Sequence, residues 1–487
     1  MVSKVVGRFL VLSCVALCGA LFPGGPGDAA PSSAIEAGGK PNVILISIDS
    51  LRADHLGCYG YGPKTSPNID RMAREGAVFE WTISSSSWTL PSHMAMFTAL
   101  PDLLHGVDRN GVKLALDHPM LAQTLREAGY TSVGFYSGPY LHPAFGFDRG
   151  FDEYINCASN PGPADAPTDE VLNPPAELHP VAWADVTNPS IYEKVTGWIG
   201  EKPQQPFFLF IHYWDVHYDY DPPEPYDKMF DPDYQGEIDV SRYPNNKAIH
   251  GRMDPRDLRH VVSLYDGEIR STDEWIGRLV EFLGKKGVLD NTLLVITADH
   301  GEEFFEHWQK AHRNNLHDES IRVPLILRLP GKIPAGFRTS AQARGIDLYP
   351  TILEIVGVER PAGLVGRSLV PLLGKHRDEI PPVAAFSELS NQERGPLFRS
   401  LRTSSWKVIQ DVVREKWEYY DLKADPGERF PIRDEEQPKA REAIAELQGV
   451  VKALELLKAS LSRRPGESRP ELDPETLERL RSLGYIK

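Results

Sequence analysis

The chain has 487 residues, a length that suggests one large domain plus a smaller one, or two to three domains, and its 41% of hydrophobic residues is typical of a globular protein. The 68 Asp and Glu outnumber the 53 Lys and Arg, so the formal net charge is −15. This balance argues against a nucleic-acid-binding surface, which should be basic. It does not exclude an anionic substrate, because a bound metal ion reverses the local field.

The N-terminus predicts an export signal. A short basic region precedes an uncharged apolar run over residues 9–22, which is shorter than the roughly 20 residues of a membrane span. We expect residues 1–22 to be a signal peptide or N-terminal anchor and residues 23–40 to be a linker. An uncleaved buried helix and a lipid on Cys14 or Cys18 stay open as alternatives. The protein is therefore expected to be exported, periplasmic or extracellular, with at most an N-terminal membrane anchor.

Three short apolar runs predict the core of a parallel sheet. Residues 43–48, 207–211 and 293–296 are almost continuously apolar, as is typical of parallel strands covered on both faces. Ligands of such sheets bind at the carboxyl ends of the strands. We therefore expect a site where these runs end, and the residues at and after their ends include Asp49, His212, Asp215, His217, Asp299 and His300.

Helical patterns alternate with these runs and predict an α/β fold, in which helices sandwich a large, mostly parallel sheet. The expected helices span residues 68–76, 91–99, 121–128, 254–285 and 348–356. Two polar segments, 159–190 and 216–255, are expected to be long loops, and the second to cover the site. The expected catalytic domain spans residues 41–385.

The sequence changes character after about residue 385. We expect short antiparallel strands within residues 400–412 and 418–422, and helices over residues 437–461 and 474–483. These elements predict a smaller C-terminal α+β part, which divides into a small sheet subdomain over residues 386–436 and a helical tail over residues 437–487.

The segment WTLPSHMAMFTA, residues 88–99, combines a hydroxyl group with a predicted helix start. Pro91 suits the first position of a helix, which places Thr89 just before the helix N-terminus. Free backbone N–H groups and the helix dipole favour a bound oxyanion there. The Thr89 hydroxyl is a weak nucleophile alone, and a divalent cation bound to it would lower its pKa. A helix cap followed by a Met-rich core helix is the alternative interpretation.

A divalent-metal site would join this hydroxyl to the strand ends. Asp299 and His300 supply a carboxylate and an imidazole side by side, and Asp49 supplies a second carboxylate. With Thr89 they make four ligands for one divalent ion, with Mn, Zn and Ca all open. A turn is the alternative interpretation for Asp-His-Gly alone.

Together these motifs resemble the sulfatase family of the alkaline-phosphatase superfamily, over residues 41 to about 430. The stretches that carry the resemblance are PNVILISIDSLRADHLGCYGY, TSPNIDRMAREGAVFE, WTLPSHMAMFTALPDLLHGV, PFFLFIHYWDVH, ITADHGEEFFEH, RVPLILRLPG, DLYPTILEIVGV, GRSLVPLL and YYDLKADPGER. The resemblance implies an alkaline-phosphatase-like sheet, a divalent metal ion and hydrolysis of a sulfate or phosphate ester.

The chain departs from that family next to the expected chemistry. Sulfatases resemble C/S-x-P-S-R at the nucleophile, where the first residue becomes formylglycine, whereas this chain has Thr89 there and His93 in place of Arg. Asp49 is followed by Ser50 rather than by a second acid, and His300 stands where Asn is common. The resulting ligand set is similar to that of lipoteichoic acid synthases, which use an unmodified Thr. The resemblance therefore implies that Thr89 itself attacks.

Further histidines are expected to support the reaction. His217 matches the family's Pro-His-x-Pro region, which implies a contact to the substrate oxyanion. His307 and His312 follow Asp-His-Gly, where relatives place a residue near the leaving group, so each is a candidate general acid. His93 is expected to brace the nucleophile or the anion, and His317 to lie on the surface. A structural role is the alternative for each.

The function predicted from the sequence is metal-dependent hydrolysis of a sulfate or phosphate ester through a covalent Thr89 ester. The expected substrate is a small-molecule, glycan or lipid ester, and no nucleic acid is expected to bind. A transferase or phosphodiesterase of the same superfamily, and an inactive binding protein on this scaffold, stay open as alternatives. The preferred ester, its alcohol, the metal and the oligomeric state stay open as well.

Overall fold

The computed structural model describes residues 39–109, 112–115, 117–158, 186–201, 205–374, 380–391, 395–433 and 437–461. Residues Gly39–Lys487 form one compact unit, which contains all of these ranges. The expected signal peptide or anchor and the expected helix over residues 474–483 lie outside the described residues, as does most of the expected loop over residues 159–190. None of the helices in the described ranges combines the length and apolar character needed to cross a membrane.

Within the described residues, a nine-stranded sheet forms the centre of the fold. Its order is β10-β2-β9-β6-β1-β5-β3-β4, with β11 also paired to β2. Neighbouring strands run parallel except around β9, which is antiparallel to β2 and β6. The strands are β1 (Asn42–Ile48), β2 (Ala77–Ile83), β3 (Thr131–Tyr136), β4 (Glu153–Asn156), β5 (Phe207–Tyr213), β6 (Thr292–Ala298), β9 (Arg322–Arg328), β10 (Phe337–Thr339) and β11 (Ala343–Arg344). The predicted large, mostly parallel sheet is confirmed.

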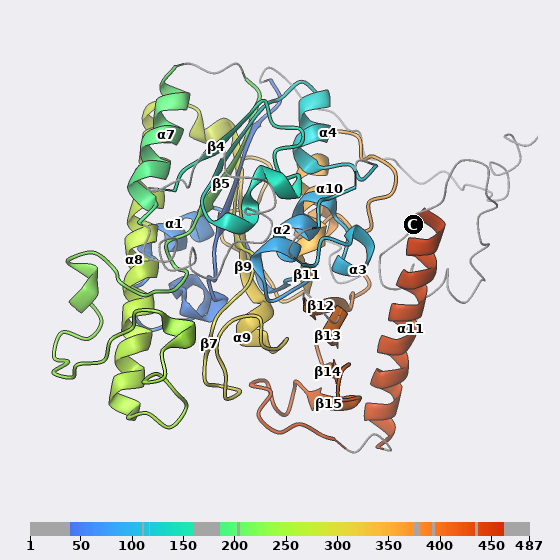
Figure 1. Cartoon of the computed structure of the whole chain (residues 1–487). Helices are drawn as coiled ribbons and strands as arrows, with labels where there is room; N and C mark the ends of the chain where they lie inside the picture. The colour runs from blue at the N-terminus through green and yellow to red at the C-terminus, as the bar shows by residue number, and fades with distance from the viewer. Residues whose placement is uncertain are drawn as a thin grey trace, which may run out of the picture. The chain divides into compact units, whose positions relative to one another are not determined.

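Helices cover both faces of this sheet (Figure 1). One face carries α1, α7 and α8, and the other carries α2, α4 and α10. The helices are α1 (Pro67–Glu75), α2 (Thr89–Thr98), α3 (Asp102–His105), α4 (Leu121–Glu127), α7 (Asn188–Gly200), α8 (Pro255–Lys285), α9 (Asp318–Ile321) and α10 (Leu348–Val356). The predicted sandwich is therefore present.

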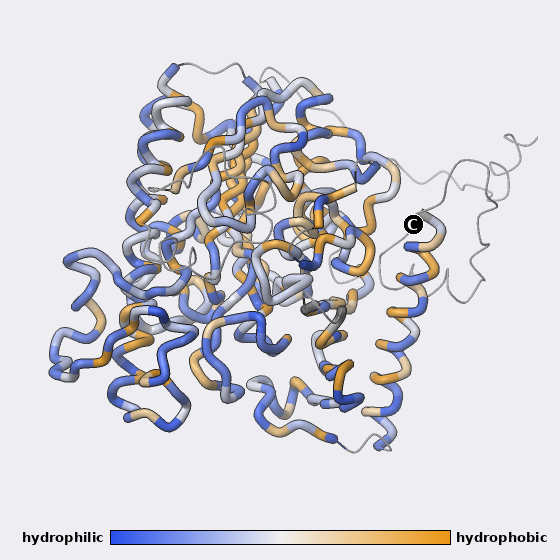
Figure 2. Tube along the Cα trace, viewed as in Figure 1, coloured by the Kyte–Doolittle hydropathy of each residue, from blue (hydrophilic) through white to orange (hydrophobic). Residues whose placement is uncertain are grey.

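Strand β1 shows why its sequence is apolar almost throughout. Val43 and Leu45 join the core under α2 and α10, whereas Ile44 and Ile46 join the core under α1 and α8. All four side chains are completely buried. Figure 2 shows the central strands as an orange interior between helices that alternate orange and blue. A strand with two covered faces has no polar side to show, which explains the continuous apolar run.

The central strands end in register, and this positions the site. Ile48 of β1 pairs with Tyr213 of β5 and with Ala298 of β6, and all three strands are parallel. The residues that follow β1 and β6, Asp49 and Asp299, therefore emerge side by side at one edge of the sheet.

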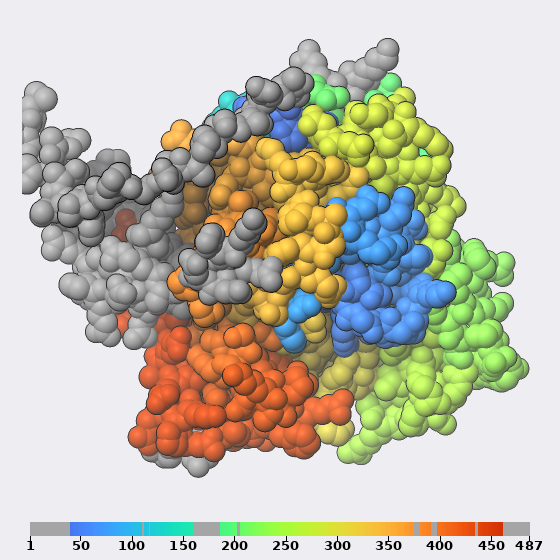
Figure 3. All heavy atoms as spheres, turned by 180° about the vertical axis from the view of Figure 1, so that it is seen from behind, coloured from blue at the N-terminus to red at the C-terminus, as the bar shows by residue number. Residues whose placement is uncertain are grey.

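A second, antiparallel sheet follows in the C-terminal part. Its strands, in the order β12-β13-β14-β15, are β12 (Ala385–Asn391), β13 (Gly395–Arg402), β14 (Trp406–Asp411) and β15 (Lys416–Asp421). Helix α11 (Pro438–Leu461) shares a buried apolar cluster with this sheet. Seen from behind, these orange and red residues lie against the yellow central part of the chain (Figure 3).

Strand β12 is joined directly to the segment that leads to Thr89. The Ser387 hydroxyl donates to the Ser84 carbonyl at 2.6 Å, and the Glu388 N–H donates to the Ser85 carbonyl at 2.8 Å. The Ser86 hydroxyl returns a bond to the Glu388 carbonyl at 2.7 Å. The small sheet therefore forms a wall of the loop that positions Thr89.

Some predicted elements differ from the structure. Helix α2 begins at Thr89 rather than at Pro91, so Thr89 occupies the first helical position and Trp88 is the cap. The prediction missed β12 and most of β13. Strand β12 buries Ser387, Glu388 and Ser390, whose polarity hides the apolar pattern of a core strand. The expected loop between β5 and α8 is confirmed, with short 3-10 helices at Tyr226–Lys228 and Tyr243–Asn245.

Candidate active site

The two strand-end carboxylates face each other through a tight turn after β1. Ser50 adopts a left-handed conformation with φ of 57°. Its N–H donates to Asp299 Oδ1 at 3.2 Å, and its hydroxyl donates to Asp49 Oδ1 at 2.9 Å. One residue thus orients both carboxylates. These two bonds explain why Ser50 is a small hydroxyl residue. An acidic residue there would place a third negative charge beside Asp49 and Asp299.

The Thr89 hydroxyl lies at the start of α2, between the carboxylate of Asp49 and the imidazole of His300. Its Oγ1 is 3.4 Å from Asp49 Oδ2 and 3.2 Å from His300 Nε2. The side chain is almost fully buried. The structure therefore brings the hydroxyl together with the predicted partners from the ends of β1 and β6.

His300 presents one defined nitrogen to this group. Its Nδ1 donates to the Gly301 carbonyl at 2.8 Å, so Nε2 carries the lone pair and directs it toward Thr89 and the two carboxylates. Nε2 lies 3.6 Å from Asp49 Oδ1 and 3.4 Å from Asp299 Oδ2. A hydrogen bond that fixes the second ring nitrogen is the usual support of a histidine metal ligand.

The charge balance at this point fits a bound cation. Asp49 and Asp299 are both completely shielded from solvent, and in the described part of the chain their ion-pair partners are all histidines. Asp299 Oδ2 is buried without a hydrogen-bond donor among those residues. Burying two carboxylates without a cation is strongly unfavourable. Oxygen and imidazole donors in this number suit one divalent ion.

The two carboxylates differ in their titration. Burial opposes ionisation of Asp49, but the nearby His212 ring and the charges of His217 and His300 outweigh it and lower its pKa. Burial, together with the negative charge of Asp49, raises the pKa of Asp299 to about 6. Asp299 is thus the carboxylate that most needs a positive neighbour to stay ionised at neutral pH.

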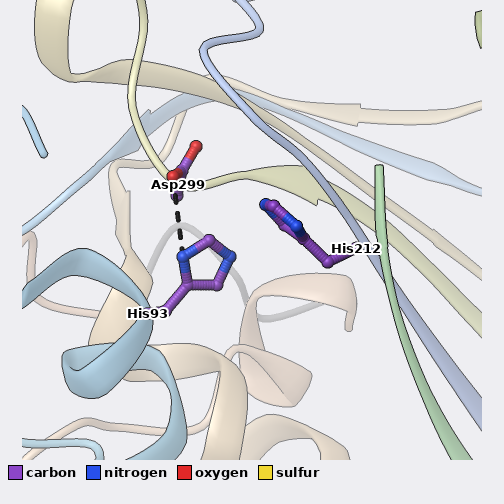
Figure 4. A group of neighbouring side chains, drawn as sticks. All are labelled: His93, His212 and Asp299. Atoms are coloured by element: carbon purple, nitrogen blue, oxygen red, sulfur yellow. Dashed lines mark ion pairs between the residues drawn. The ribbon is translucent and has the colours of Figure 1, made fainter. Parts of the chain in front are cut away.

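His93 supports the backbone of Thr89 rather than offering a free donor atom. Its Nδ1 donates to the Thr89 carbonyl at 3.0 Å, and its Nε2 accepts from the Ser47 hydroxyl at 2.9 Å. Burial, followed by the charge of His212, lowers its pKa to about 3, so the ring is neutral. Figure 4 shows His93 facing the Asp299 carboxylate, with Nδ1 to Oδ2 at 3.5 Å.

His212 is a site residue to which the sequence reasoning gave no role. It lies near the end of β5 beside β1, and its Nε2 is 3.4 Å from Asp49 Oδ2. Neither ring nitrogen has a hydrogen-bond partner among the described residues. Figure 4 shows it beside His93 and Asp299. The position of His212 directly after the apolar run 207–211 was the feature of the sequence that could have identified it as a site residue. The nearby Asp215 instead accepts N–H groups of Thr187 and Asn188 at the start of α7.

His217 and His312 form a second pair of rings next to the carboxylates. The His217 ring stacks on Trp214 at 3.9 Å, and its Nδ1 donates to the Tyr218 carbonyl at 2.8 Å. Burial, partly offset by the charge of Asp49, lowers the pKa of His217 to about 4. The His312 ring lies 4.3 Å from the His300 ring and 5.1 Å from the His217 ring.

His312 is held by Glu302 in a neutral state. Its Nδ1 is 3.3 Å from Glu302 Oε1. Burial, followed by the charges of His300 and His217, lowers the pKa of His312 well below its usual value, and burial raises the pKa of Glu302 well above its own. A protonated Glu302 donating to Nδ1 places the ring proton of His312 on Nε2.

His307 lies in a different environment, although it belongs to the same hairpin, β7 (Glu303–Phe304) and β8 (Lys310–Ala311). Its Nδ1 donates to Glu319 Oε1 at 2.5 Å and its Nε2 donates to the Glu428 carbonyl at 2.6 Å. Both nitrogens are therefore committed to the junction with the C-terminal part, and neither is free to protonate a leaving group.

The prediction that His317 is a surface residue is wrong. The side chain is buried, stacks on His307 at 3.6 Å and lies 3.1 Å from Glu428 Oε2. Glu428 also pairs with the fully buried Lys407 at 2.8 Å. The acidic neighbours of His317 suggested solvent, but Asp318, the first of them, pairs with Lys407 of the small sheet at 2.9 Å.

Comparison with known proteins identifies relatives of the whole fold. The family model described as sulfatase matches residues 41–358, and the model for the C-terminal part of N-sulphoglucosamine sulphohydrolase matches residues 306–455. An N-acetylglucosamine-6-O-sulfatase of Bacteroides thetaiotaomicron is 25% identical, over 80% of this chain and 82% of that protein. An arylsulfatase of Clostridium perfringens is 26% identical, over 82% of this chain and 92% of its own length.

Solved structures show the same fold. The phosphonate monoester hydrolase of Agrobacterium radiobacter superposes with a TM-score of 0.67 at 22% identity, covering 86% of this chain and 96% of that one.

Proposed function

Because the chain belongs to the sulfatase family of hydrolases, we propose that it hydrolyses a sulfate or phosphate ester with Thr89 as the nucleophile. The observation that carries this proposal is the position of Thr89 Oγ1, 3.2 Å from His300 Nε2 and 3.4 Å from Asp49 Oδ2 at a helix N-terminus. Thr89 stands where the family's modified residue is expected, and an unmodified hydroxyl is a competent nucleophile once activated.

One divalent ion is part of this proposal. Asp49, Thr89, Asp299 and His300 would hold it, because their open donor atoms converge and the two buried carboxylates need a cation. Such an ion supplies Lewis acidity, which lowers the pKa of a bound hydroxyl or water and offsets the negative charge of the ester oxygens.

The residues then divide the work of the first step. Thr89 Oγ1 gives up its proton to solvent and forms the bond to sulfur or phosphorus, while the Asp49 carboxylate 3.4 Å away keeps the oxygen in position. The free N–H groups at the start of α2 face the oxyanion that develops. The neutral His217 ring uses its one N–H for the Tyr218 carbonyl, so its role is to line the site. His93 keeps the Thr89 backbone in place through its bond to the Thr89 carbonyl.

Cleavage requires a proton for the leaving alcohol. As the bond from sulfur or phosphorus to the alcohol oxygen breaks, His312 gives its Nε2 proton to that oxygen, and the Glu302 proton moves to Nδ1 over 3.3 Å. We assign this role to His312 rather than His307, whose nitrogens are both engaged at the junction. Water then attacks the Thr89 ester and gives a proton to His312 Nε2, while the Nδ1 proton returns to Glu302. The bond from Oγ1 to sulfur or phosphorus breaks, sulfate or phosphate leaves and Thr89 is restored.

A side-by-side assay tests the proposal. The purified chain is given aryl sulfate, phosphate monoester, phosphate diester and phosphonate monoester substrates, each with Mn, Zn or Ca. We expect one ester class to dominate, and we expect the preference to depend on the ion. The phosphonate ester is included because a phosphonate monoester hydrolase shares this fold. Equal turnover by the Thr89→Ala variant would disprove the proposed nucleophile.

A further inference from the structure

The β7–β8 hairpin and the residues just after it, which include His312, hold four non-glycine residues in a conformation that favours glycine. Phe305, Trp308, Ala311 and Arg313 have φ values of 71°, 68°, 63° and 67°. Each costs conformational energy that glycine would avoid. Side chains kept at strained positions beside a catalytic site are candidates for a function of their own. Arg313, next to His312, is the strongest candidate of the four.

The Arg313 guanidinium is placed beside the nucleophile. It lies 3.8 Å above the centre of the ring of Trp88, the residue before Thr89, and its Nη1 is 3.4 Å from the Tyr140 hydroxyl. The Arg313 N–H also donates to the Ser87 carbonyl at 3.1 Å. Stacking on an aromatic face fixes the plane of a guanidinium and leaves its edge available for a planar or tetrahedral anion.

Arg313 lacks the acidic partner that a half-buried arginine normally has. Among the described residues no carboxylate forms an ion pair with it, and the contact to Tyr140 engages one nitrogen of a guanidinium group that carries five N–H donors. Arg52 and Arg402 each pair with a carboxylate at 2.8 Å.

A cavity of about 410 Å³ presents this cation to a ligand. Gln309, Arg313 and Asn314 of the hairpin line one side. The small sheet and the turn after β14 line the other, through Leu397, Phe398, Asp411, Val413 and Arg414. Thr89 is not part of the lining, so a group in this cavity belongs to the remainder of the substrate and not to the ester being cleaved.

We infer that Arg313 determines specificity by binding an anionic substituent, a carboxylate, sulfate or phosphate, on the alcohol part of the ester. The inference rests on the proposed function, because it assigns the substrate class of that same site. The substrate is then a doubly anionic molecule, with one group cleaved at Thr89 and the other bound in the cavity by charge-assisted hydrogen bonds to the guanidinium.

The test compares two matched esters, 3-carboxyphenyl and its neutral isostere 3-carbamoylphenyl, as the sulfate or phosphate. The ratio of kcat/KM for the two is measured for the natural protein and for Arg313→Gln. We expect the natural protein to favour the carboxylate by about tenfold to a hundredfold, mainly through KM, since the contact persists from ground state to transition state. Arg313→Gln brings this ratio close to one, and Arg313→Lys retains part of it.

Two controls separate the ways in which the test can fail. Arg414→Gln removes a cation from the same cavity, but one already paired with Asp411 at 2.8 Å, so the ratio should persist. Calorimetric binding of both esters to Thr89→Ala, with and without Arg313→Gln, gives the same preference independently of turnover. An unchanged ratio in Arg313→Gln, an equal loss in Arg414→Gln, or equal binding of the two esters overturns the inference. Binding preference without turnover by the natural protein instead contradicts the proposed function alone.

Discussion

Two histidines on one hairpin, His312 and His307, have opposite environments. Burial next to other imidazoles lowers the pKa of His312 well below its usual value. Burial also opposes protonation of His307, but the hydrogen bond and charge of Glu319 outweigh it and raise its pKa to about 9. One ring is therefore neutral and faces the carboxylates of the site, whereas the other is a cation clamped between two parts of the chain.

This difference shows that the hydrogen-bond partner of a histidine determines its role more than its position in a sequence motif does. His312 hydrogen-bonds to Glu302, a carboxyl group that burial itself keeps protonated. His307 hydrogen-bonds to Glu319 and to a backbone carbonyl. The first arrangement keeps a proton mobile, and the second makes a fixed charged link.

Replacing Thr89 is expected to have the largest effect on kcat, because it removes the proposed nucleophile, without which the general acid His312 has no reaction to assist. Thr89→Ala should lower kcat by on the order of 10⁴-fold or more. Metal content, measured by atomic emission, should fall but not vanish, because three ligands stay. Thr89→Ser keeps the hydroxyl and should retain measurable turnover. Full metal content in an inactive Thr89→Ala protein would show that the hydroxyl is not a ligand.

The matched variants His312→Asn and His307→Asn test the comparison directly. His312→Asn should lower kcat by about 10²- to 10⁴-fold, with the larger losses for alcohols of high pKa, which most need a proton. His307→Asn should leave kcat near that of the natural protein. A plot of log kcat against leaving-group pKa measures both. A steeper slope for His307→Asn would reverse the assignment.

The charged link of His307 should make stability depend on pH. Its folded-state pKa of about 9 lies above the unfolded value of about 6.5. The stabilisation is therefore complete below about pH 6.5 and is lost as the pH rises through about 9. His307→Gln should lower the free energy of unfolding by on the order of 3 kcal/mol at pH 6.5 and far less at pH 9.5. Urea titrations at the two pH values provide the measurement.

The smallest expected effect concerns the turn of the hairpin between these histidines. Trp308 is 80% exposed and has φ of 68°. Trp308→Gly relieves the left-handed strain and should raise the free energy of unfolding by about 1 kcal/mol. Trp308→Ala, which keeps the strain, is the control, and thermal unfolding compares the two. A gain shared by both variants would point to the exposed ring rather than to the backbone.

The sheet and the convergence of its strand ends were predictable from the sequence. The runs at β1, β5 and β6 are apolar because both faces of each strand are covered, and the parallel register brings Asp49 and Asp299 to one edge. The position of Thr89 followed from the neighbouring proline, although α2 begins two residues earlier than expected.

The histidine environments were not predictable, because they depend on contacts distant in the chain. Glu428, which holds His307 and His317, lies more than 100 residues after them. His212 required knowledge that β5 lies beside β1, and β12 carries polar residues that bond to the Thr89 loop. Local patterns of apolar residues carry no information about such pairings.

The three hydrogen bonds between β12 and residues Ser84, Ser85 and Ser86 have a consequence for dissecting this protein. A shortened chain that stops before β12 would keep every proposed metal ligand and general acid. It would nevertheless remove hydrogen-bond partners from the segment that leads to Thr89, the proposed nucleophile. We expect the truncated protein to bind the divalent ion but to hold the Thr89 hydroxyl in the wrong position.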